Sequence, residues 1–183
     1  MSDKISVRIS YTIPEDVPPE DGALPPISEG LANYLRTHAV DLEHPAVGLG
    51  GADRGEGPGT GINNDVPFSF VFLKFDSIIR AILTLDLEPK DPLVTTDGLQ
   101  FTDNWESDPT VPDKLYGNDV LRVLMVGERT VVNFDLTNIN LKDGANENLA
   151  YLLVDGNLDV IYRDDAIIYA VTLDIEGTAA SLI

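Results

Sequence analysis

Apolar and polar residues alternate along several segments of the chain. In residues 4–13, KISVRISYTI, an apolar side chain occupies every second position, and Lys, Ser, Arg or Thr lies between. The same period of two returns in residues 66–75, 77–89 and 129–139. Because successive side chains of a β-strand point to opposite faces, this pattern is typical of strands with one buried face. The sequence therefore predicts a domain built mainly of half-buried strands.

The alternation also predicts which side chains face the core. The strand in residues 77–89 is expected to end at Pro89, because proline has no backbone donor for a central strand. A short strand is expected around Leu99 and Phe101. The other positions expected inward are Ile5, Val7, Ile9, Tyr11, Phe68, Phe70, Phe72, Ile79, Ala81, Leu83, Leu85, Leu87, Val132, Phe134 and Leu136.

The segment DGNLDVIYRDDAIIYAVTLDI, residues 155–175, predicts two more strands. Their expected buried faces are Leu158, Val160 and Tyr162 in the first, and Ile167, Tyr169, Val171, Leu173 and Ile175 in the second. Asp164 and Asp165 lie between these strands. Asp bonds its own backbone and tolerates turn dihedrals, so the pair favours the corner of a hairpin. A catalytic pair and half of a calcium site are the alternatives.

Three stretches depart from the period of two. Ser28 is a typical N-cap residue, and the apolar residues after it follow near helical spacing, which predicts a short helix. A second short helix is expected after Asn146, with Gly156 just beyond its end. In residues 116–127 the apolar run is too short for its period to separate helix from strand.

Proline and glycine divide the chain into three parts. Five prolines in residues 14–26 block helix and central strand, so an extended arm is expected there. Residues 48–61 hold seven glycines but neither the Lys nor the following helix of a phosphate-binding loop, which favours a connector. We expect a strand and Pro-rich arm in 1–26, a short helix and Gly-rich connector in 27–65, and the main domain in 66–183. The fold class expected is all-β, an antiparallel β-sandwich or jelly roll with one to three short helices.

Charge and composition exclude several classes of protein. A net charge of -19 repels phosphate backbones, so nucleic acid is not an expected partner. The chain has no cysteine, which removes disulfides, thiolate metal sites and thiol nucleophiles. Its first residues lack the apolar core of a signal peptide, and no run reaches the roughly 18 apolar residues of a membrane span. We therefore expect neither export by such a leader nor membrane insertion.

No motif points to catalysis. His38 and His44 are six positions apart, which is not one face of a helix, so a zinc site is not expected. The nucleophile-elbow motif of serine hydrolases is absent, and nothing selects two of the 31 acidic residues as a glycosidase pair. The sequence therefore predicts a protein that is not an enzyme.

Acidic loops and two aromatic residues are the candidates for binding. Calcium takes six to eight oxygen ligands, and Asp103, Asp143, Asp164 and Asp165 are the candidate ligands, although no loop has the EF-hand spacing. Trp105 lies in the polar context TDNWESD and Tyr116 in KLYGND. Such residues either stack on a sugar ring or a partner, or close the end of the sandwich.

Residues 66–176 resemble a domain of bacterial secreted and surface proteins, often those with a PEP-CTERM sorting tail. The similarity lies in SIIRAILTLDLEP, VNFDLTNI and, most specifically, NLAYLLVDGNLDVIYRDDAIIYAVTLDI, beside the family pattern DGxLDVxxxDDTAVDYAxLxI. The resemblance implies a lectin-like β-sandwich at the cell surface or outside the cell. This chain has AIIY where the family has TAVDY, so the third acid of that pattern has no counterpart.

These observations favour a non-enzymatic structural or interaction subunit that self-assembles into an oligomer or polymer through its N-terminal strand. Val7, Ile9 and Tyr11 are the expected contact residues. The thirteen residues from Pro14 to Pro26 span on the order of 40 Å when extended, enough to reach a neighbouring copy. Alternatively, the strand folds back onto its own sandwich. A second function, a calcium-supported carbohydrate-binding module, follows from the resemblance.

Overall fold

Strands dominate the computed structural model. It describes residues 4–12, 28–29, 31, 66–89, 98–101, 118–121, 123–139, 150, 153–163 and 166–179. The strands are β1 (Lys4–Thr12), β2 (Val66–Val71), β3 (Phe75–Pro89), β4 (Gly98–Phe101), β5 (Thr130–Asp135), β6 (Asn157–Arg163) and β7 (Ala166–Ala179). A short helix, α2 (Asn118–Leu121), and a 3-10 turn, η1 (Leu136–Asn138), flank β5. The predicted all-β class is confirmed.

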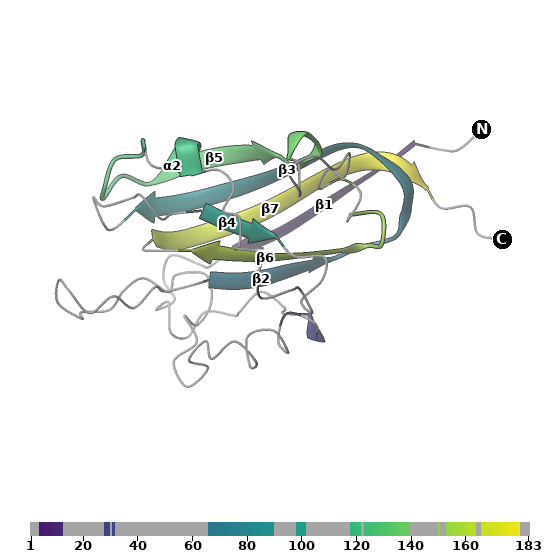
Figure 1. The fold of residues 1–183 in the computed structure, drawn as a ribbon, viewed down its shortest axis with the longest axis horizontal. Coiled ribbons are helices and arrows are strands. Elements are labelled where there is room, and N and C mark those ends of the chain that lie inside the picture. Colours follow the sequence, from purple (N-terminus) through teal and green to yellow (C-terminus); the bar gives the residue numbers. More distant parts are fainter. Residues whose placement is uncertain are drawn as a thin grey trace, which may run out of the picture.

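The strands form two antiparallel sheets, of order β1-β7-β3-β5 and β2-β6-β4 (Figure 1). Successive strands alternate between the sheets, and the pairs β1–β7, β2–β6 and β3–β5 are nested around β4. The chain therefore runs as one long hairpin ribbon, rolled so that alternate strands fall in opposite layers. This nesting is the arrangement of a jelly roll.

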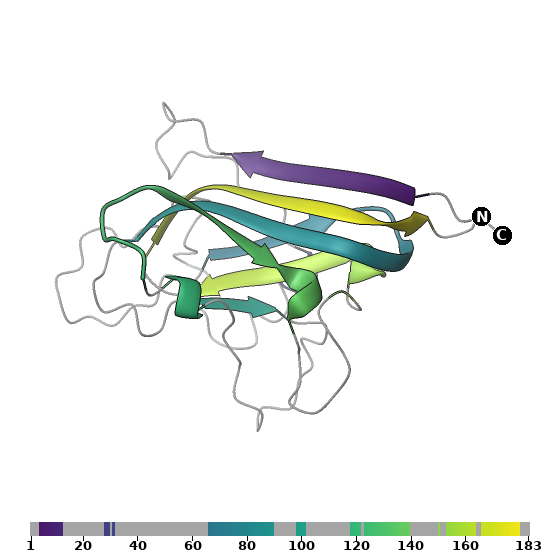
Figure 2. The same ribbon diagram turned by 90° about the horizontal axis from the view of Figure 1, so that it is seen from above.

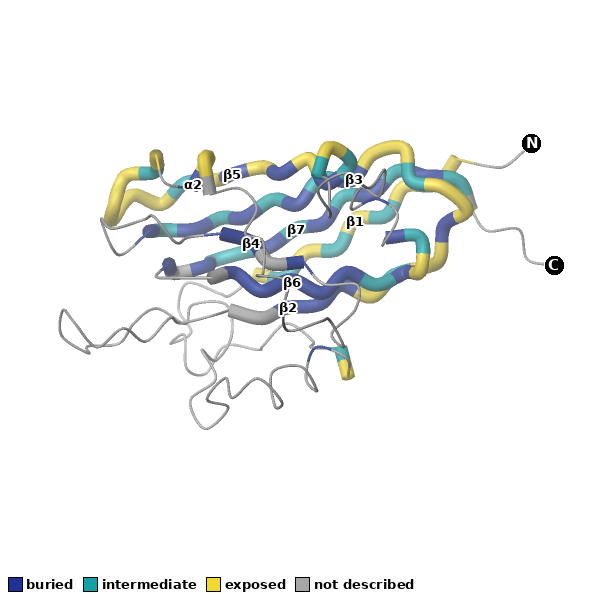
Figure 3. The backbone as a smooth tube through the Cα atoms, in the orientation of Figure 1, coloured by how far each residue is buried: buried dark blue, intermediate teal, exposed yellow. Residues whose placement is uncertain are grey.

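The core lies between the two sheets, which stack face to face in Figure 2. Along β3, fully buried side chains at Ala81, Leu83, Leu85 and Leu87 alternate with partly exposed ones, as the period of two predicted. The opposite sheet contributes Phe68, Phe70, Leu158, Val160 and Tyr162. Figure 3 shows buried and intermediate positions alternating along most of β3 and β7, and a nearly unbroken buried stretch along β6. Burying each large side chain contributes about 1.5–3 kcal/mol.

Strand β1 packs on the sandwich of its own chain. All nine of its residues pair with β7, from Lys4 opposite Thr178 to Thr12 opposite Ala170. Its apolar side chains, among them Val7 and Ile9, are partly buried against the core. The ring of Tyr11 stacks on Phe70 with centroids 5.4 Å apart. The intrachain alternative for the N-terminal strand is therefore the one that the structure adopts.

Bulges in the β3–β7 ladder overturn two predicted positions. Ile79, predicted inward, is 47% exposed, because the register steps from Ile78 to Arg80 and leaves Ile79 without a partner on β7. Tyr169, also predicted inward, is an extra residue on β7 between the paired residues Ile168 and Ala170. An extra residue shifts the phase of the alternation. Ala166 and Ile168 consequently face the core in its place.

The predicted hairpin at Asp164 and Asp165 is also wrong. Strand β6 belongs to the three-stranded sheet and β7 to the four-stranded sheet, so the connection between them links the two layers. The strand prediction on either side is correct, but a hairpin requires its two strands to pair with each other. The two aspartates themselves lie outside the described residues.

The predicted helix ends are confirmed where the structure describes them. The Ser28 Oγ accepts a hydrogen bond from the Leu31 N–H at 3.0 Å, as an N-cap side chain does. Gly156 has φ +83°, and its N–H donates to the Leu153 carbonyl at 3.2 Å. In the stretch that the period left open, helix α2 is followed by turns up to Gly127.

Candidate functional site

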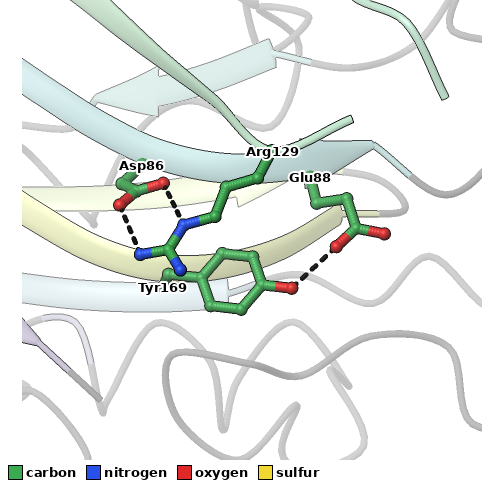
Figure 4. A network of polar contacts seen from close by, with 4 residues as sticks. All are labelled: Asp86, Glu88, Arg129 and Tyr169. Carbon is green, nitrogen blue, oxygen red and sulfur yellow. Dashed lines mark hydrogen bonds and ion pairs between the residues drawn. The ribbon is translucent and has the colours of Figure 1, made fainter. Parts of the chain in front are cut away.

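The bulge at Tyr169 creates a polar cluster on the solvent-facing side of the four-stranded sheet. Asp86 and Glu88 alternate with the buried Leu85 and Leu87 of β3, so both carboxylates point away from the core. Figure 4 shows Arg129 between Asp86 and the ring of Tyr169, with Glu88 at the phenol. Bulges commonly re-aim a side chain next to a functional site. We call these four residues the β5 clamp, because Arg129 immediately precedes β5.

Arg129 and Asp86 form a bidentate ion pair. Arg129 Nε donates to Asp86 Oδ1 at 2.9 Å, and Nη2 donates to Oδ2 at 2.8 Å. Two parallel charge-assisted bonds match the planar guanidinium to the carboxylate and hold both side chains in one orientation. This pair joins the residue before β5 to the adjacent strand β3.

Tyr169 adds β7 to the cluster. The guanidinium carbon of Arg129 lies 4.2 Å from the centre of the phenol ring, within cation–π range. The phenol donates to Glu88 Oε2 at 2.7 Å. This hydrogen bond, together with burial and the Glu88 charge, raises the pKa of Tyr169 to about 12. The phenol therefore keeps its proton at neutral pH.

The contacts of the β5 clamp join strands of the four-stranded sheet to one another. Asp86 is neutralised by Arg129, and a phenol with a pKa of about 12 is a weak general acid. In the cluster, the Asp86 carboxylate is held by Arg129, and the Glu88 carboxylate accepts a hydrogen bond from the phenol O–H of Tyr169. These contacts tie the start of the edge strand β5 to its neighbour β3 and to β7, the next strand of the sheet.

A second polar cluster lies on the outer face of the three-stranded sheet. Ser69 and Asp159 are opposite each other on β2 and β6, and both are buried. The Ser69 hydroxyl donates to Asp159 Oδ1 and accepts from the Ser28 N–H at 2.8 Å. The Ser28 hydroxyl donates to Asp159 Oδ2, also at 2.8 Å. A buried carboxylate is tolerated because it is hydrogen-bonded, and here it fastens the segment at Ser28 to the sheet.

The predicted binding residues divide into two groups. Val7, Ile9 and Tyr11 are described and lie together on the inner face of β1. The other candidates lie outside the described residues, and their roles stay predictions: Asp103, Asp143, Asp164, Asp165, Trp105 and Tyr116. Within the described residues there is no group of three metal-ligating side chains. No helix in this part of the chain is long and apolar enough to span a bilayer.

Sequence reasoning missed the β5 clamp. It placed Tyr169 in the core and attached no role to Asp86, Glu88 or Arg129. The only local signal was the run AIIYA in residues 166–170, where every residue is apolar and the phase of a strand is therefore undetermined.

Comparison of the chain with protein-family models, with curated proteins and with solved structures finds no match. The similarity to the surface-protein domain therefore stays a prediction.

Proposed function

We propose that this protein is a non-enzymatic structural or interaction subunit that self-associates through strand β1. The supporting observation is the position of β1 at the edge of the four-stranded sheet. No described strand pairs with its second edge, so the backbone N–H and C=O groups on that side are not paired within the sheet. Such an edge is a template for a strand from another chain.

The shape of β1 suits strand addition. Its nine residues extend about 30 Å at the usual rise, contain neither Pro nor Gly, and pair with β7 without a register shift. Proteins usually protect long edges with charged side chains, proline, bulges, short strands or inward-pointing charges. Of these devices β1 has only two outward-facing charges. The inward side chains of β1 are apolar, and its charges, Lys4 and Arg8, lie on the outer face.

Charge favours the same strand. The chain carries -19, so two copies repel each other over most of their surfaces. Lys4 and Arg8 make β1 the described element whose charged residues are all basic. They pair across to Glu176 at 3.2 Å and Asp174 at 3.7 Å, but both contacts are exposed and therefore weak. An acidic neighbour meets the least repulsion at this edge.

The experiment is sedimentation velocity over a range of protein concentrations, comparing Arg8→Glu with Arg80→Glu. Both substitutions change the net charge equally, but Arg80 lies on the interior strand β3. We expect the parent protein to associate with increasing concentration, Arg8→Glu to weaken this by about tenfold or more, and Arg80→Glu to have a much smaller effect. A parent protein that stays monomeric, or equal effects of the two substitutions, contradicts the proposal. Circular dichroism verifies that both variants fold.

A further inference from the structure

We infer that the acceptor for β1 is the free edge of β5 on a second copy of this chain, so that copies join head to tail into one continuous antiparallel sheet. This inference rests on the proposed function. Strand β5 ends the four-stranded sheet on the side opposite β1, and within the described residues it pairs only with β3.

Strand direction permits this contact without turning the second copy over. All neighbours in the order β1-β7-β3-β5 are antiparallel, so β1 and β5 run in opposite directions. A second copy in the same orientation therefore presents its β1 antiparallel to β5 of the first. The two partner surfaces differ, and the step can repeat, which produces an open filament rather than a closed dimer.

The inner and outer faces of the two edge strands can also be aligned with each other. On β5, Val132 and Phe134 point to the core, while Val131, Asn133 and Asp135 are exposed. On β1, the odd-numbered residues from 5 to 11 point inward and the even-numbered residues from 4 to 12 point outward. Pairing that keeps these faces aligned extends both the apolar layer and the polar face across the junction.

Charge selects this pairing over the symmetric ones. Two antiparallel β1 strands in full overlap bring Arg8 against Arg8. Because the charged residues of β1 are both basic and the one charged residue of β5 is acidic, neither β1–β1 nor β5–β5 pairing can set a cation opposite an anion. When β5 pairs with β1 of a second copy so that outward side chains stay on the outer face, two registers place Asp135 opposite a cation. In one register the cation is Arg8 of the second copy, and in the other it is Lys4. The Asp135 carboxylate is already held in place by the Thr137 N–H at 3.0 Å and by Asn138 Nδ2 at 2.6 Å.

The acceptor edge is preorganised. The β5 clamp holds Arg129, the residue before β5, through the bidentate bond to Asp86 and the contact with Tyr169. A strand that is already ordered loses less conformational entropy when a partner binds. Val131, on the outer face of β5, is 58% exposed, and a neighbouring strand would cover part of it.

The test is disulfide trapping, which is clean because the chain has no cysteine. Asn133→Cys is combined with Ser10→Cys, its partner when Asp135 lies opposite Arg8, or with Ser6→Cys, its partner when Asp135 lies opposite Lys4. Within one chain, positions 133 and 10 are about 14 Å apart across three strand spacings, and positions 133 and 6 are further apart, so neither pair can form an intrachain bond. After oxidation, we expect one of the double variants to give a ladder of covalent multimers on a non-reducing gel.

Single variants and a matched control complete the test. An equimolar mixture of the two single-cysteine variants of the productive pair should stop at dimers, since each chain then has one reactive edge. Thr172→Cys with Asn133→Cys is the control, because Thr172 lies opposite Ser10 on the interior strand β7 and should not link.

The outcomes separate the two proposals. Two results would overturn β5 as the acceptor while leaving self-association through β1 intact. One is that a variant with a single cysteine in β1 forms disulfide dimers as fast as the mixture does. The other is that the protein associates but no double variant gives a ladder. A protein that sediments as a monomer at all concentrations and forms no cross-links overturns both.

Discussion

Tyr169 shows how one residue changes the surface of this molecule. The residues on either side of it are paired with β3, and Tyr169 is not. Its ring leaves the core side and stacks under Arg129, and its phenol O–H donates a hydrogen bond to Glu88 Oε2. One extra residue in a strand thereby connects three strands of the sheet, and the connection depends on a protonated phenol.

Stability should therefore fall at high pH through Tyr169. Its pKa of about 12 in the folded protein lies above the ordinary value of 10, so the unfolded chain ionises first. The contribution is fully present below pH 10 and is lost as the pH rises toward 12. In Tyr169→Phe this part of the pH dependence should disappear. The measurement is the free energy of unfolding in urea at pH steps from 8 to 12, for parent and variant.

Glu88→Gln is the matched control for this prediction, because it keeps an acceptor for the phenol and removes the charge. Absorbance of the phenolate should then show a lower pKa for Tyr169 than in the parent. Equal loss of stability in the parent and in Tyr169→Phe between pH 10 and pH 12 would show that the phenol is not linked to folding.

At the scale of elements, the turn before β6 depends on one glycine. Gly156 lies three residues after the helical residue Leu153 and has φ +83°. Its carbonyl accepts a hydrogen bond from the Phe72 N–H at 2.9 Å. A Cβ at this position would lie 2.6 Å from the Phe72 carbonyl oxygen, so part of the backbone would have to move. The turn thus requires both a left-handed conformation and the close approach of two segments.

Gly127→Ala separates these two requirements, because Gly127 has φ +77° but nothing within 4 Å of its Cβ position. We expect Gly127→Ala to cost about 1–2 kcal/mol of unfolding free energy from the left-handed strain alone. Gly156→Ala should cost clearly more, since it adds the contact with Phe72. Urea unfolding of the two variants measures the difference, and equal losses would mean that the backbone at Phe72 yields at no cost.

For the whole molecule, the net charge of -19 sets the response to cations. Self-repulsion of an acidic surface opposes the compact state, so millimolar calcium should raise the melting temperature by screening. Magnesium at the same ionic strength is the control. A larger shift with calcium would indicate a specific site, and equal shifts would leave screening alone and remove the predicted calcium site. No shift with either ion would show that repulsion does not limit stability.

The period of two was enough to identify the strands and most of their buried faces. The core-facing side chains follow their alternation as predicted: Ala81, Leu83, Leu85 and Leu87 on β3, Val132 and Phe134 on β5, and Leu158, Val160 and Tyr162 on β6. Helix ends at Ser28 and Gly156 were equally readable, because a cap depends on residues a few positions away. Strand alternation and helix caps each depend on residues that are close together in the sequence, so the sequence is enough to predict them.

The partners of each strand, the positions of the bulges and the β5 clamp were decided only by tertiary structure. Lys4 and Glu176 pair across 172 positions of sequence, and no local pattern contains that contact. Ile79 and Tyr169 were misplaced because a bulge is a mismatch between two strands, visible only when both are aligned. The hairpin predicted between β6 and β7 was wrong for the same reason, because these strands belong to different sheets and the layer that a strand enters depends on the pairing of all the strands.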